Sequence, residues 1–115
     1  MSDVEPAISE DSLAQLETYI GAAEVAGLVE LFGANLRDIT EPAAASMRPA
    51  EIGKAAHLLI SLGGSFGCAE LVARSRDLLD AVHASADDLA APFAVTLAAA
   101  ERAKQALERR YPSQG

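Results

Sequence analysis

The chain has 115 residues, half of them hydrophobic, and a formal net charge of −8 from 17 acidic and 9 basic side chains. This length suits one domain with its own core, and the negative charge repels nucleic acid. The single cysteine, Cys68, excludes an internal disulfide framework. No apolar run approaches the ~20 residues that span a bilayer, and the acidic N-terminus is unlike a secretory signal. We therefore expect a soluble, cytoplasmic protein that binds neither nucleic acid nor membranes.

Helical periodicity runs through most of the sequence, and alternating β-branched or aromatic stretches are missing. Ser9 and Ser12 are candidate N-caps for a first helix. Apolar residues then recur every three to four positions in five successive segments, which is the spacing of one helix face. These residues are Leu13, Leu16 and Ile20; Val25, Leu28, Phe32, Leu36 and Ile39; Ile52, Ala56 and Leu59; Leu71, Ser75, Leu78 and Val82; and Leu89, Phe93, Leu97, Ala100 and Leu107.

Helix-breaking residues separate these segments. Gly21 divides the first two, and Pro42 ends or kinks the second because proline removes a helical hydrogen bond. Pro49 is well placed as the first residue of the third helix. The glycines of residues 63–67 predict a break or bend before the fourth, and residues 84–88 supply a capping region for the fifth.

Amphipathic helices with short connections are typical of a bundle. We predict an all-α fold, an antiparallel four-helix bundle with an additional short N-terminal helix. Residues 9–111 form this single domain, between flexible tails at residues 1–8 and 112–115. No heptad run is long enough for a coiled coil, so we expect a monomer.

One of the two histidines, His57, lies in an otherwise apolar helical stretch, "KAAHLLISLGGSFGCAEL". At about 100° per residue, His57 falls well away from the apolar stripe of its segment. It shares a solvent-facing or boundary line with Gly53, Ser61 and Gly64. A chance surface histidine is the ordinary interpretation, but small neighbours also leave an imidazole open to the active site of another protein.

Other kinds of site have less support. His57, Cys68 and His83 are too far apart in sequence for a metal-binding pattern, and no spacing indicates a nucleophile, a base and an orienting group. "LGGSFG" lacks the spacing of a phosphate-binding loop. We therefore expect no metal and no cofactor, and Cys68 is interpreted as a small core residue.

The segment "AHLLISLGGSFGCAELVARSRDLL" resembles the signature of histidine phosphotransfer (HPt) domains, the intermediate carriers of bacterial phosphorelays. The family pattern is a histidine, a leucine two positions later, often Lys-Gly next, then small residues, a hydrophobic residue, a glycine, and a leucine four further. The matching positions are His57, Leu59, Ile60-Ser61, Gly63-Gly64-Ser65, Phe66, Gly67 and Leu71, with Leu78 continuing the pattern. Upstream, "GAAEVAGLVELFGANLRDI" resembles the second helix of the family, so the resemblance covers roughly residues 9 to 110.

This chain departs from the family pattern at two positions. Ile60 replaces the frequent lysine that helps hold the phosphoryl group, and Ser61 replaces the glycine after it. Lys54, three residues before His57, lies on a neighbouring line of the helix and is a candidate substitute. Ser61 and Gly64 keep the approach open, and the serine hydroxyl is a candidate hydrogen-bond donor to phosphate.

The resemblance implies that His57 accepts a phosphoryl group from a receiver-domain aspartate or a sensor histidine kinase and passes it to a response regulator. Histidine can serve as a neutral nucleophile near pH 7, and the metal site of the partner would stabilise the transferred charge. The chain has no visible ATP-binding region, so we expect a phosphocarrier and not an enzyme. The alternative is an HPt-like interaction module that docks receiver or kinase domains without accepting phosphate, and a small helical enzyme or metal protein has no motif behind it.

Overall fold

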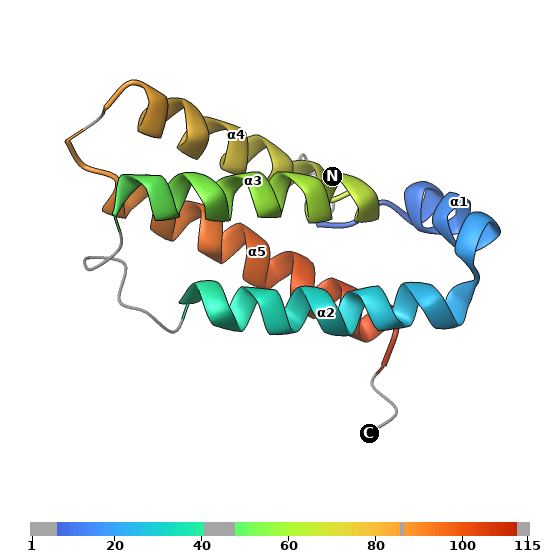
Figure 1. The fold of residues 1–115 in the computed structure, drawn as a ribbon. Helices are drawn as coiled ribbons and strands as arrows, with labels where there is room; N and C mark the ends of the chain where they lie inside the picture. The colour runs from blue at the N-terminus through green and yellow to red at the C-terminus, as the bar shows by residue number, and fades with distance from the viewer. Residues whose placement is uncertain (1–6, 41–47, 86, 113–115) are drawn as a thin grey trace, which may run out of the picture.

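Five α-helices make up the regular structure of the computed structural model, which describes residues 7–40, 48–85 and 87–112 (Figure 1). They are α1 (Glu10–Ile20), α2 (Ala22–Thr40), α3 (Pro49–Phe66), α4 (Ala69–His83) and α5 (Ala90–Arg110). The all-helical class predicted from the sequence is confirmed for these residues. Pro42, most of the expected N-terminal tail and the last three residues lie outside the described ranges.

The two N-terminal helices begin and end at residues that the sequence singles out. The Ser9 hydroxyl accepts a hydrogen bond from the Ser12 backbone N–H at 3.2 Å, and so caps α1. Gly21 ends α1 with a φ of 89°, a conformation that glycine adopts without a steric penalty. Its N–H donates to the Glu17 carbonyl at 2.8 Å. The predicted division at Gly21 is confirmed.

Helix α3 begins at Pro49, as predicted, because a first-turn proline gives up no helical hydrogen bond. The backbone N–H of Arg48 donates to the Glu51 carboxylate at 2.9 Å and secures this first turn. The expected break before α4 falls at the last of the glycines, because α3 continues through Gly63 and Gly64 to Phe66. It ends at Gly67, whose φ of 70° is left-handed.

The most extensive packing between helices joins α3 to α4, which lie side by side in Figure 1. Gly63 makes this possible, since a Cβ built on it would lie 3.2 Å from Val72 Cγ2 and 3.3 Å from Leu71 Cδ2. Helix α5 packs on both α4 and α2, and α1 packs on α2 and α3. The two aromatic rings of Phe32 and Phe66 bridge α2 and α3, with centroids 5.9 Å apart.

One hydrophobic core receives side chains from all five helices. Its largest fully buried members are Phe32, Phe66, Phe93, Leu13, Leu59, Leu71, Leu78 and Leu107. At about 25 cal/mol for each Å² of apolar surface removed from water, side chains of this size are the main source of stability. The radius of gyration, 14.4 Å, is close to the roughly 13 Å typical of a compact domain near this length.

Polar contacts join the C-terminal end of α5 to α1. Arg110 reaches the carboxylates of Glu10 at 3.0 Å and Glu17 at 3.5 Å, and the Tyr111 hydroxyl donates to Glu17. Burial and this hydrogen bond raise the pKa of Tyr111 to about 12. Within the described ranges, no helix has the length and apolar character needed to cross a membrane.

Candidate functional site

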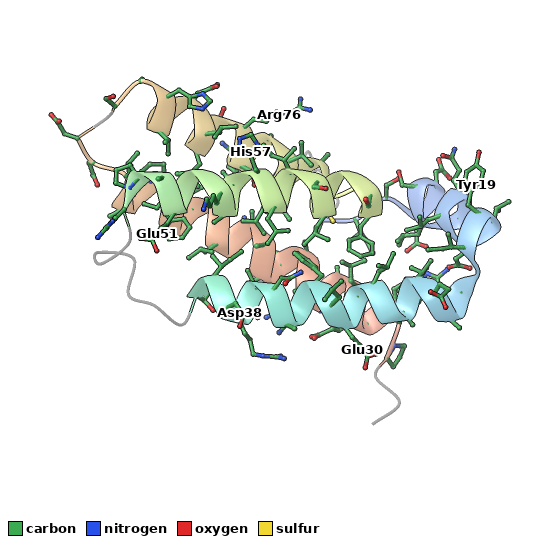
Figure 2. The ribbon with its side chains drawn as sticks, viewed as in Figure 1. Tyr19, Glu30, Asp38, Glu51, His57 and Arg76 are labelled. Carbon is green, nitrogen blue, oxygen red and sulfur yellow. The ribbon has the colours of Figure 1, made fainter. Side chains whose placement is uncertain are left out.

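His57 lies in the middle of α3 with its side chain exposed, as its angular position predicts (Figure 2). Its helical neighbours Ala56 and Leu59 have no exposed surface and face the core. The same turn of helix therefore fixes the backbone through buried neighbours and leaves the imidazole at the surface. This arrangement suits a side chain that another molecule must reach.

The small residues around His57 are not equivalent. Ser61 and Gly64 are exposed, and a Cβ built on Gly64 would meet no atom within 4 Å. Gly53 is buried instead, with a built Cβ 3.6 Å from Val82 Cγ1. Ser61 and Gly64 therefore leave the imidazole of His57 sterically accessible, whereas Gly53 lies in the contact between α3 and α4.

Lys54 lies on the side of His57 that faces α2. It is exposed and lines a groove of about 360 Å³ between α2 and α3, together with Asp38, Glu51 and Leu58. Neither carboxylate approaches the Lys54 ammonium closely enough to form an ion pair within the described residues. Lys54 is thus near the histidine in sequence but shares its groove with two acidic side chains.

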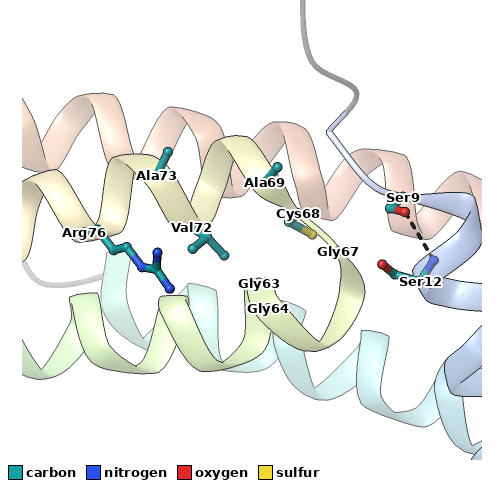
Figure 3. A pocket seen from close by; sticks show the side chains of 10 residues that line it. All are labelled: Ser9, Ser12, Gly63, Gly64, Gly67, Cys68, Ala69, Val72, Ala73 and Arg76. Carbon is teal, nitrogen blue, oxygen red and sulfur yellow. Dashed lines mark hydrogen bonds between the residues drawn. The ribbon is translucent and has the colours of Figure 1, made fainter.

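A second hollow, of about 430 Å³, lies beyond Gly64 where α3 turns into α4 and meets the start of α1 (Figure 3). Most of its lining is small, and Arg76 of α4 is the one cation among the described residues that line it. The lining residues are Ser9, Ser12, Gly63, Gly64, Gly67, Cys68, Ala69, Val72, Ala73 and Arg76. Nothing in the local sequence relates Arg76 to His57, so the sequence pattern does not identify this arginine.

Cys68 and His83 have structural surroundings that match their sequence-based interpretation. Cys68 is fully buried and belongs to the core, and this burial raises the pKa of its thiol to about 12. A thiol with so high a pKa is a poor nucleophile at neutral pH. His83 is the last residue of α4 and is exposed, where a positive charge is mildly favourable.

No group of three or more metal-ligating side chains comes together within residues 7–40, 48–85 and 87–112. Comparisons with protein-family models, with curated proteins and with solved structures gave no match to this chain.

Proposed function

We propose that this chain is a phosphorelay carrier whose phosphoryl-accepting residue is His57. The observation that carries the proposal is the exposure of this imidazole on a helix whose neighbouring residues Ala56 and Leu59 are buried in the core. The open surface at Ser61 and Gly64 supports it, because a partner's active site must approach the ring closely. In this proposal α2 to α5 form the antiparallel four-helix bundle of an HPt domain, and α1 is the additional N-terminal helix.

The transfer step needs only an imidazole nitrogen with a free lone pair. That lone pair forms the new phosphorus–nitrogen bond while the phosphorus–oxygen bond to the donor aspartate breaks. The bonding electrons leave on the aspartate carboxylate. The ring, left with a positive charge, becomes neutral when its other nitrogen releases its proton to solvent. Phosphoryl transfer depends mainly on positioning and charge stabilisation, so we expect the receiver domain with its metal ion to supply much of the catalysis.

Receiver domains of response regulators and a sensor histidine kinase are the proposed partners, docking on the helices that flank His57. The alternative function is an HPt-like interaction module that binds these partners without accepting phosphate. Ile60 favours the alternative, since it stands where the family pattern often has a lysine, and it is partly buried and uncharged.

The deciding experiment is phosphotransfer from phosphorylated receivers of the source organism to the purified protein. Wild type should acquire label that is labile in acid and stable in base, as a phosphorus–nitrogen bond requires. His57→Gln should acquire none, and His83→Gln is the matched control that should label normally. Circular dichroism should show that both variants remain folded, because both side chains are exposed.

Persistent labelling of folded His57→Gln would place the site elsewhere. If no receiver labels wild type but a receiver still binds it, the interaction module is the correct function.

A further inference from the structure

Arg76 is an exposed cation on α4 without an ion-pair partner among the described residues. Its neighbour Arg74 differs, since it pairs with Asp77 at 3.5 Å. Asp80 lies one turn beyond Arg76 on the same helix, but the two side chains do not form an ion pair. The guanidinium of Arg76 therefore keeps its donors available for another anion.

The register between α3 and α4 brings Arg76 to the level of His57. A Cβ built on Gly53 would lie 3.6 Å from Val82, and one built on Gly63 would lie 3.2 Å from Val72. Ten residues forward along α3 thus correspond to ten residues back along α4, and Leu59 is opposite position 76. His57 is two residues from that level, which is about 3 Å along the helix axis.

The two side chains also border the same surface. Gly64 follows His57 by two helical turns on one face of α3, and Gly64 and Arg76 both line the 430 Å³ hollow. Figure 3 shows the Arg76 side chain extending from α4 toward the seam with α3, and Figure 2 shows His57 and Arg76 on the same side of the molecule. Lys54 lies on the other flank of His57, in the groove with Asp38 and Glu51.

We propose that Arg76 contacts the phosphoryl group carried by His57. Its positive charge would replace that of the lysine which the family pattern often has at the position of Ile60. This inference rests on the proposed function and names a second residue for it. A guanidinium presents a planar set of donors that matches two phosphate oxygens at once. The positive charge beside the phosphoryl group thus comes from Arg76 on the neighbouring helix α4, and not from the turn of α3 that follows the histidine.

The test uses phosphoramidate, a small donor that transfers its phosphoryl group to imidazole with loss of ammonia and needs no protein partner. All proteins carry His83→Gln, so that His57 is the one remaining histidine. The variants are Arg76→Ala, Arg76→Lys and Lys54→Ala, with Arg74→Ala as the matched control from the same helix. The measurements are the initial rate of His57 phosphorylation and the lifetime of phosphohistidine, both followed by intact-protein mass spectrometry.

Arg76→Ala should lower the rate by about two- to fivefold, the range that an exposed ion pair allows. Arg76→Lys should recover part of the loss, and Arg74→Ala should match the parent. High salt should narrow the difference between Arg76→Ala and the parent, because exposed charges are screened. An effect of Lys54→Ala larger than that of Arg76→Ala would overturn the inference and assign the role to Lys54.

The inference and the proposed function can fail separately. Equal rates for Arg76→Ala and the parent would overturn the role of Arg76, even if receivers still phosphorylate His57. Failure of every receiver to label wild type would overturn the carrier function. A lower phosphoramidate rate in Arg76→Ala would then still support the contact between this side chain and the phosphoryl group.

Discussion

The two sides of α3 come from the same 18 residues but are built differently. One side buries Ile52, Leu59 and Phe66, which are at most 3% exposed. The other side presents His57 and Gly64 to solvent. A single helix thus separates residues that hold the fold from exposed residues at the candidate site. Substitutions on the first side should mainly lower stability, and substitutions on the second should mainly change phosphotransfer.

Phe66→Ala should give the largest loss of stability in this comparison. The Phe66 ring is fully buried and packs on Phe32, so its removal should lower the free energy of unfolding by about 3–5 kcal/mol. Urea unfolding followed by circular dichroism measures the change. Leu58→Ala is the control from the open side, because Leu58 is 36% exposed. If both variants lose the same stability, the two sides of α3 do not differ as described.

Gly67→Ala and Gly64→Ala form a matched pair near the end of α3. Gly67 has a left-handed backbone, and a Cβ there would lie 2.6 Å from the Ser12 side chain. We expect Gly67→Ala to cost about 1–3 kcal/mol from this overpacking. Gly64 is helical and open, so alanine there should stabilise the helix by up to about 1 kcal/mol. The same urea titrations measure both variants, and a destabilising Gly64→Ala would contradict the open surface.

Alkaline pH should lower the stability of the fold through Cys68, which lies in the hydrophobic core just after α3. Its thiol keeps its proton in the folded protein up to about pH 12, whereas the unfolded chain loses it above about pH 8.5. Above that pH the unfolded state binds fewer protons, so stability falls as pH rises, by up to about 1.4 kcal/mol per pH unit. Urea unfolding at pH 8, 9 and 10 under reducing conditions measures this slope.

Cys68→Ala is the control for the alkaline slope and should flatten it between pH 8 and 10. Tyr111 does not obscure this window, since it adds its own loss only above about pH 10. An unchanged slope in Cys68→Ala would assign the effect to other groups.

Gly64→Arg should change stability little and should slow phosphotransfer. A long side chain has room there, so the free energy of unfolding should change by less than about 1 kcal/mol. It should nevertheless slow phosphotransfer from a receiver, because it covers the approach to His57. Gly64→Gln separates size from charge, and Ser61→Arg tests the other exposed neighbour. Unchanged transfer in all three variants would show that partners do not dock on this face.

The sequence was sufficient for much of the fold because the relevant signals are local. Ser9, Gly21 and Pro49 mark helix ends through hydrogen bonds or backbone angles of their own segments. The apolar periods identified most of the buried positions, although Ile20 at the end of α1 is 40% exposed. Of the glycines that predict a break before the fourth helix, Gly67 ends α3. Gly63 and Gly64 stay helical, and packing against Leu71 and Val72 favours a small residue at position 63.

The candidate site was only partly accessible from the sequence. The exposure of His57 follows from its angle on one helix, which a sequence contains. The place of Arg76 depends on how α3 and α4 align, and the sequence alone does not fix that register. Spacing along the chain puts Lys54 about one helical turn from His57, whereas the fold places it in a groove with Asp38 and Glu51.

The contact between α1 and the end of α5 has a consequence for the order of folding. Only Gly67 and Cys68 separate α3 from α4, so these two helices can pair after closing a very short loop. The ion pair of Arg110 with Glu10 instead joins residues 100 positions apart in the chain. A contact between residues far apart in the chain costs more loop-closure entropy than a contact between near neighbours, and this cost comes before the contact can stabilise the fold. We therefore expect the helical hairpin that carries His57 to assemble early, and the contact between α1 and the end of α5 to form last.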